Sequence, residues 1–201
     1  MLKSYLMNTA KKEVIVTPDP RLRQKSTKAK ANDAETQRII AEMIQSCIDW
    51  ENEHEFELSA AMAAPQLGYN KRIIVVREDM NNKDNTNFTA LLNPEVIKTE
   101  GKIIEDYEGC LSVPTIYGKV PRPAKARIKA QLEDGTEVRL KATDFLARTI
   151  LHEIDHLNGI LFIDHIKDNP QAFYKLDDKG DLVPLDYDTY IKDNPDLWPE
   201  D

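Results

Sequence analysis

Residues 152–156 read His152-Glu153-Ile154-Asp155-His156, within a segment that carries the signals of a buried helix. The apolar residues of this segment surround the helix axis almost completely, and they are Phe145, Leu146, Ile150, Leu151, Ile154 and Leu157. Thr143 is placed to cap the helix and Gly159 to end it. Histidines four residues apart project from one face of a helix, about 6 Å apart along its axis. The pattern therefore predicts that His152 and His156 reach the same metal ion.

Glu153 directly follows the first histidine, where its carboxylate can contact a water molecule bound to such a metal. Two imidazoles without partners would be costly in an apolar core, which favours a metal site. The alternative interpretation is a pair of hydrogen-bonded core histidines with Glu153 pointing to solvent. The five-residue pattern alone leaves both interpretations open.

Two histidines do not complete a metal site, because catalytic zinc-type sites usually take three protein ligands and leave one position to water. Cys110 is the best candidate for the third ligand, since it lies in a turn-like segment, Glu108-Gly109-Cys110-Leu111-Ser112, that can present a thiolate. Gly109 indicates that the backbone there comes close to another group. A buried free cysteine is the alternative for Cys110. His165 is a weaker candidate ligand, and His54, at the end of a polar helix, is expected at the surface.

A third segment, residues 59–66, reads Ser-Ala-Ala-Met-Ala-Ala-Pro-Gln. So many alanines cannot fill a core, and they suit a place where the backbone of a ligand approaches closely. The side chain of Gln66 can offer an amide N–H₂ group to a developing oxyanion.

The remaining chain predicts one more helix and several strands. A helix capped by Asn32 or Asp33 is expected to run to about Glu55, with Cys47 as a small hydrophobe on its buried face. Four consecutive β-branched residues indicate a buried strand over 72–77, and shorter strands are expected at 14–16, 91–98 and 102–105. Residues 127–132 and 137–141 alternate in polarity around Asp134-Gly135, which predicts a hairpin. The sequence thus predicts an α+β domain of short antiparallel strands packed around the central helix.

Composition narrows the classes of function. The 201 residues carry a net charge of −8, which argues against a dedicated nucleic-acid binder. No apolar run is long enough for a membrane span or an export signal, so we expect a cytoplasmic protein with reduced cysteines. Acidic residues gather near the C-terminus, where eleven of them stand against four basic residues between Asp164 and Asp201. We expect residues 167–201 to form an acidic extension, with a hairpin around Asp178-Lys179-Gly180 and then a poorly ordered tail.

Taken together and in this order, the three segments resemble the motifs of the peptide deformylase family. The family's Gly-φ-Gly-φ-Ala-Ala-Pro-Gln motif (φ apolar) corresponds to residues 59–66, its Glu-Gly-Cys-Leu-Ser motif is intact at 108–112, and its His-Glu-x-x-His motif is intact at 152–156. Residues 18–23, Pro-Asp-Pro-Arg-Leu-Arg, are similar to the family's opening. The resemblance covers roughly residues 13–166, which predicts a catalytic domain over 1–166 before the extension.

The resemblance implies removal of the formyl group from the N-terminal methionine of new polypeptides. It implies one divalent metal held by Cys110, His152 and His156, commonly Fe²⁺ in the cell, with Zn²⁺, Ni²⁺ or Co²⁺ able to occupy the site. Glu153 would move the proton, while the Gln66 amide and the Leu111 backbone N–H would hold the oxyanion. The substrate contacts that it implies are Ala60, Ala61, Met62, Glu108, Gly109, Phe145 and Arg148. The expected partners are the formylmethionyl peptide and, transiently, the ribosome, with no nucleic acid bound directly and no membrane.

One departure from the family pattern concerns the substrate. Both glycines of the first motif are replaced, by Ser59 and Ala61. Either Ala61 is strained in a conformation that favours glycine, or its methyl group narrows the groove. Two other functions stay open: a catalytically altered deformylase-like binding protein, and a His-Glu-x-x-His metallopeptidase. Asp155, on the buried helix, needs a partner for its charge, and the family resemblance implies Arg122 as the candidate. The alternative is that Asp155 is simply hydrated.

Overall fold

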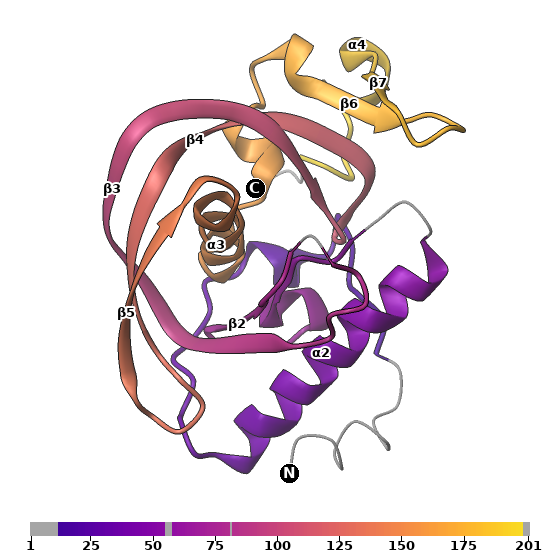
Figure 1. Cartoon of the computed structure of the whole chain (residues 1–201). Helices are drawn as coiled ribbons and strands as arrows, with labels where there is room; N and C mark the ends of the chain where they lie inside the picture. Colours follow the sequence, from indigo (N-terminus) through magenta and orange to yellow (C-terminus); the bar gives the residue numbers. More distant parts are fainter. Residues whose placement is uncertain (1–11, 55–57, 81, 199–201) are drawn as a thin grey trace.

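The computed structural model describes residues 12–54, 58–80 and 82–198. Across these residues, seven strands form one antiparallel sheet with the order β1-β2-β3-β4-β6-β7, and β5 pairs with β4. Strands β3, β4 and β5 curve around helix α3 (Asp144–Leu157), which Figure 1 shows end-on at the centre, while α2 (Ala34–Glu53) lies outside the curve. The α+β class with antiparallel strands around a central helix is confirmed.

Strand β2 (Ile73–Arg77) is buried on both faces, between the two long helices. Ile73 and Val75 belong to the apolar cluster that contains the buried face of α2. Ile74 and Val76 belong to the cluster that contains α3. Because side chains alternate along a strand, a strand covered on both faces needs apolar residues at every position. The predicted strand over 72–77 is confirmed.

Helix α2 begins at the predicted place. Asp33 is the cap, and its Oδ2 accepts a hydrogen bond from the Thr36 backbone N–H at 3.2 Å. Cys47 is fully buried on the apolar face, as expected. The helix ends at Glu53, and the predicted end at Glu55 lies outside the described residues.

Strands β3 (Phe88–Cys110) and β4 (Val113–Gln131) are far longer than the sequence suggested. The two short strands expected at 91–98 and 102–105 are one continuous strand, with irregularities in its pairing that include the stretch between Glu100 and Ile103. Gly101, with φ +85°, lies in this stretch, so the glycine bends the strand instead of ending it. Strand β5 (Glu137–Thr143) pairs with β4 across the turn at Asp134-Gly135, which confirms the predicted hairpin.

Helix α3 follows β5 directly. It is buried from Ala147 onward, but Phe145 and Leu146 in its first turn are exposed, so the helix is less enclosed at its start than predicted. Thr143 is the capping residue by position, yet its side chain makes no capping hydrogen bond. Residues 14–16 form no strand; they run extended beside the turn η3 (Ala64–Leu67), where the Ile15 N–H donates to the Gln66 carbonyl at 2.8 Å.

The C-terminal part packs on the end of β4 instead of trailing into solvent. After the short turns η4 (Phe162–His165) and η5 (Pro170–Ala172), strands β6 (Phe173–Leu176) and β7 (Leu182–Pro184) form a hairpin, and the short helix α4 (Tyr187–Tyr190) follows. Ile191 and Leu197 are buried in the same apolar cluster as Phe162 and Phe173. As far as Trp198 the segment is therefore not the poorly ordered tail that its acidic composition suggested. Among the described residues, no helix is long and apolar enough to cross a membrane.

Candidate functional site

Two elements, β3 and α3, bring one sulfur and two ring nitrogens together. Cys110 lies at the end of β3, and His152 and His156 lie on α3. One ligand atom from each of these residues lies within 4.8 Å of the other two. The Sγ atom of Cys110 is 3.1 Å from Nε2 of His156.

Glu108 fixes the orientation of the His152 ring. His152 donates its Nδ1–H to Oε2 of Glu108 at 2.8 Å, so its Nε2 is the nitrogen left for a ligand. Glu108 is itself held by Arg122, which donates from Nε at 2.8 Å and from Nη2 at 2.9 Å, and by Arg148 Nη1 at 2.7 Å. Burial raises the pKa of the Glu108 carboxyl, but the hydrogen bonds from Arg122 and His152 outweigh it and hold the pKa far below the usual range. The carboxylate therefore stays charged beside His152.

The thiol of Cys110 is prepared to act as a thiolate. Burial raises its pKa, but the neighbouring His156 and His152 imidazoles outweigh burial and lower the pKa to about 5. A thiolate with two imidazole nitrogens is a donor set that suits a divalent transition metal such as zinc or iron. The residues present therefore fit the metal that the motif implies.

Glu153 lies next to this group with an unpaired oxygen. Its side chain is buried, and Oε2 has no hydrogen-bond partner among the described residues. Burial raises the pKa of this carboxyl to about 7. A buried carboxyl group with a free oxygen facing a cleft is suited to taking up and giving back a proton near neutral pH. This position excludes the interpretation in which Glu153 points to solvent.

The amide of Gln66 is oriented by its own turn. Its Oε1 accepts a hydrogen bond from the Ala63 backbone N–H at 2.8 Å. The Nε2 group therefore points the other way, 3.6 Å from Cys110 Sγ and 3.3 Å from Ser112 Oγ. This places an N–H donor beside the sulfur, and the role of this donor toward an oxyanion stays a prediction.

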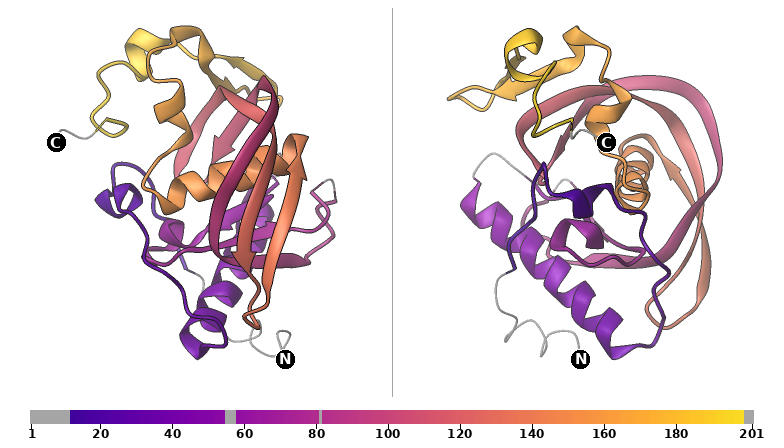
Figure 2. Two further views of the ribbon diagram at one scale, coloured as in Figure 1. Left: turned by 90° about the vertical axis from the view of Figure 1, so that its left-hand side faces the viewer. Right: turned by 180° about the vertical axis from the view of Figure 1, so that it is seen from behind.

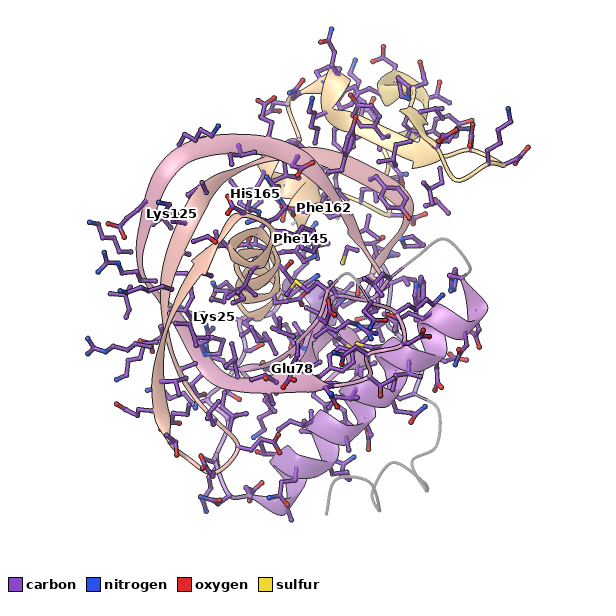
Figure 3. The ribbon with its side chains drawn as sticks, viewed as in Figure 1. Lys25, Glu78, Lys125, Phe145, Phe162 and His165 are labelled. Atoms are coloured by element: carbon purple, nitrogen blue, oxygen red, sulfur yellow. The ribbon has the colours of Figure 1, made fainter. Side chains whose placement is uncertain are left out.

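A further group of charges, whose members do not line the cleft, supports α3 through Asp155. Arg122 Nη1 donates to Oδ2 of Asp155 at 2.6 Å, which confirms the predicted pairing. His165 contacts the same Oδ2 atom through Nε2 at 2.7 Å. Figure 3 shows His165 and Phe162 beside α3, on the turn that follows the helix. His165 is thus a partner of Asp155 and not a member of the sulfur–nitrogen group.

A cleft of about 920 Å³ opens beside the metal group. It is lined by Gln66, Cys110, Leu111, His152 and Glu153, and also by the predicted substrate residues Ala60, Ala61, Glu108, Gly109, Phe145 and Arg148. Met62 does not line the cleft, because its side chain points into the core of the α2 side and is fully buried. The charged ends of Glu108 and Arg148 are engaged with each other, and Arg148 also donates to the carbonyls of Ile104 and Val120.

The group that comes close to the backbone of Gly109 is the ring of Tyr117. A Cβ atom at this position would lie 2.6 Å from Cε1 of Tyr117, which faces Gly109 across the β3–β4 pair. Ala61, which replaces a motif glycine, is not among the described non-glycine residues with positive φ. Backbone strain at Ala61 is therefore excluded, and the remaining explanation is that its methyl group narrows the groove.

Several lining residues were not predicted. His54 is not a free surface residue: its ring stacks on Trp50 with the centroids 3.9 Å apart, and both line the cleft. An aromatic pair four residues apart at a helix end was the available signal. The cleft residues contributed by β6, β7 and α4 have no comparable signal in the sequence. Ser112, fully buried behind Gln66, belongs to the motif at 108–112, but its contact with Gln66 was not predicted.

The family model for polypeptide deformylase matches residues 11–172 of this chain. The chain belongs to the peptide deformylase family. It is 38% identical over 177 residues to the peptide deformylase of Thermomicrobium roseum, covering 87% of this chain and 96% of that protein. It is 44% identical over 148 residues to the enzyme of Halothermothrix orenii, covering 74% of this chain and 88% of that protein.

Solved structures of deformylases share the fold. A peptide deformylase from Synechococcus elongatus in complex with actinonin superposes with a TM-score of 0.69 and 33% identity, over 79% of this chain and 82% of that chain. A class I type b deformylase from Acinetobacter baumannii with Met-Ala-Ser bound gives a TM-score of 0.70 and 27% identity, over 79% of this chain and all of that chain.

Proposed function

We propose that this chain is a metal-dependent hydrolase that removes the N-formyl group from the N-terminal methionine of newly made polypeptides. One observation carries the proposal: in a member of the deformylase family, Cys110, His152 and His156 converge beside the free oxygen of a buried Glu153. The Met-Ala-Ser peptide bound by the Acinetobacter baumannii enzyme supports a peptide ligand in the corresponding cleft.

The metal would be held by Cys110 Sγ and by one ring nitrogen from each of His152 and His156. When bound, a divalent metal lowers the pKa of a water molecule and polarises a carbonyl group. We propose Fe²⁺ as the metal in the cell, and Zn²⁺, Ni²⁺ or Co²⁺ as ions that can replace it in purified protein. Because intrinsic affinities do not favour iron over these three, the identity of the metal depends on supply.

Glu153 is the proton carrier in this proposal. It accepts a proton from the attacking water at Oε2 while the water oxygen bonds to the formyl carbon. It then gives the proton to the methionine nitrogen as the carbon–nitrogen bond breaks. The products are formate and a free N-terminal amine, and the Glu153 carboxylate is restored.

Gln66 and Leu111 hold the formyl oxygen. As the water adds, negative charge gathers on this oxygen, and hydrogen-bond donors aimed at it stabilise the transition state. The orientation of the Gln66 amide supports the first donor. We assign the second to the backbone N–H of Leu111, which follows Cys110 in the turn between β3 and β4.

The substrate would lie along the open edge of β1 (Ala61–Ala63), whose one partner among the described strands is β2. Ala60 and Ala61 would contact its backbone, while Met62 could contribute backbone atoms only. The methionine side chain would enter beside Phe145 and Gly109, where Glu108 and Arg148 form a wall fixed by their own hydrogen bonds.

Release of formate from formyl-Met-Ala by metal-loaded protein, purified without oxygen, tests this function. Acetyl-Met-Ala and unformylated Met-Ala-Ser are the matched controls. We expect formate from the formyl peptide only. Cleavage of Met-Ala-Ser would instead indicate the metallopeptidase, and binding of formyl-Met-Ala without turnover would indicate the binding protein.

Three further proposals concern the location of the enzyme, its contact with the ribosome and the division of the chain. We place the enzyme in the cytoplasm, where a reduced thiol can serve as ligand; both cysteines are free in this structure, which is compatible with that location. We propose that contact with the ribosome is transient, since the substrate is a nascent chain. We also propose a functional division into a catalytic part, residues 1–166, and an extension, residues 167–201.

A further inference from the structure

The cleft has a wall that comes from the C-terminal segment. Its residues are Lys175, Leu176, Gly180, Leu182, Leu185, Tyr190 and Asn194, and we call them the C-terminal wall. All seven follow residue 172, where the match to the deformylase family model ends. This wall is therefore a feature that the family pattern does not describe.

The C-terminal wall is fixed to strands β4 and β3, and β3 carries Cys110. Strand β6 pairs with β4 through Tyr174 opposite Tyr117 and Phe173 opposite Gly118. The ring of Tyr174 also meets the ring of Tyr107 on β3, edge to face, with centroids 4.9 Å apart. The wall is thus held at a set position relative to Cys110, three residues beyond Tyr107 on the same strand.

The wall is largely apolar, with Lys175 and Asn194 as its polar side chains. Leu176 and Leu182 lie opposite each other in the β6–β7 pair, so their side chains share one side of the hairpin. Tyr190, on α4, is 52% exposed although it lines the cleft, so about half of the residue is available for contact. Lys175 is the only charged residue of the wall.

The wall faces the other boundary of the cleft across the catalytic group. That boundary is formed by Trp50 on α2, by His54 at the end of this helix, and by Leu58. Figures 1 and 2 show β6, β7 and α4 above and α2 below, and the separation persists in all three views. A volume of about 920 Å³ lies at the upper end of the range for drug-sized ligands, which leaves room for more than formylmethionine.

An extended peptide advances about 3.3 Å per residue, so the second and third residues of a substrate lie within about 10 Å of the reacting bond. They must leave the cleft along one of its walls. We propose that the C-terminal wall is a specificity surface for the substrate residues that follow methionine, and that it favours apolar side chains there. This inference rests on the proposed deformylase function.

Kinetics on four formyl tripeptides test the proposal: formyl-Met-Leu-Ser, formyl-Met-Asn-Ser, formyl-Met-Ala-Leu and formyl-Met-Ala-Asn. Leucine and asparagine are similar in size, so each pair compares apolar with polar at one position. We expect kcat/KM to favour leucine at one of the two positions by roughly three- to tenfold, as for modest apolar contacts. In Tyr190→Ala and Leu182→Ala this preference should fall toward one.

Two further variants make the result specific. Tyr190→Phe keeps the ring and should keep the preference. Asp188→Ala removes a side chain that is 81% exposed on the same short helix and does not line the cleft, so it should also keep the preference. Thermal unfolding of each variant shows whether the fold is intact.

Formate release from formyl-Met-Ala by the wild-type protein tests the proposed function separately from the role of the C-terminal wall. If no formyl peptide is a substrate, the proposed function fails. If all are substrates but leucine and asparagine are equal at both positions, or if the preference survives both alanine variants, the C-terminal wall is not a specificity surface.

Discussion

Cys110 is the residue that distinguishes a metal centre from a pair of buried histidines. Replacing it with alanine removes the only sulfur of the donor set and leaves two ring nitrogens, too few for tight binding. We expect Cys110→Ala, purified without oxygen, to contain far less than one metal per chain by elemental analysis.

The other cysteine provides the control. Burial raises the pKa of Cys47 to about 12, and the residue is fully buried on α2, so it offers no thiolate to a metal. Cys47→Ala should therefore keep its metal. Full metal content in Cys110→Ala would overturn the ligand assignment.

Glu153 is expected to matter for the chemical step and not for metal binding. Glutamine has nearly the same shape but cannot accept the proton, so Glu153→Gln should keep the metal and the unfolding temperature while kcat falls by about 10²–10⁴. Glu105→Gln, an exposed residue on β3, serves as the control and should retain turnover. Near-normal turnover by Glu153→Gln would remove Glu153 from the mechanism.

The identities of these residues could be predicted from spacing, but their orientations could not. Histidines four apart and a nearby cysteine motif indicate a donor set. Which nitrogen of His152 is free depends on Glu108, 44 residues earlier in the chain. Which end of the Gln66 amide faces Cys110 depends on a backbone N–H in the same turn. Such contacts depend on the folded arrangement and leave no periodic pattern in the sequence.

At the scale of elements, the strands with a strong pattern were predictable and the others were not. The apolar run of β2 follows from its burial between α2 and α3. Strand β4 contains Pro114, Pro121 and Pro123, residues that normally argue against a strand. It pairs nevertheless with β3 along its length, since β3 itself is irregular there and bends. Gly101, which lies between the two short strands expected from the sequence, bends β3 and does not end it.

Strand β1 is the element through which the altered first motif acts. Ala61 lies on the sheet edge and lines the cleft, and it is free of backbone strain, so its methyl group is the part that meets substrate. Ala61→Gly should lower KM for formyl-Met-Ala, by up to about fivefold if the methyl costs about 1 kcal/mol of binding, with kcat little changed.

Added backbone freedom of glycine works in the opposite direction and would raise KM if it dominates. Steady-state kinetics of this single variant decides between the two effects. An unchanged KM with a several-fold altered kcat would contradict both and place residue 61 in the catalytic machinery.

At the scale of the molecule, three apolar clusters meet around the site. One lies between α2 and the sheet, one between the sheet and α3, and one beneath the C-terminal segment. The first two were foreseeable from helical and strand periodicity. The third was not, because Ile191 and Leu197 are few and widely spaced anchors in a mostly polar stretch, and such anchors produce no periodic signal.

A buried ion pair connects the first helix to the segment that forms the cleft. Arg77, at the end of β2, donates from Nη2 to Oε1 of Glu51 on α2 at 2.5 Å, and both side chains are almost completely buried. The same Glu51 oxygen accepts the Ser59 backbone N–H at 2.8 Å, and Arg77 Nε donates to the Ser59 carbonyl at 3.3 Å. The pair thus holds the chain two residues before β1.

Removing one partner should therefore destabilise the whole fold. Arg77→Met leaves the Glu51 charge buried without its partner, and we expect the free energy of unfolding in urea to fall by about 3–5 kcal/mol. The double variant Glu51→Gln/Arg77→Met removes both charges, so its loss should be clearly smaller than the sum of the two single losses. Arg127→Met breaks an exposed pair with Glu100 and should change stability little. If Arg77→Met unfolds at the same urea concentration as Arg127→Met, the buried pair does not hold α2 against the segment that leads into the cleft.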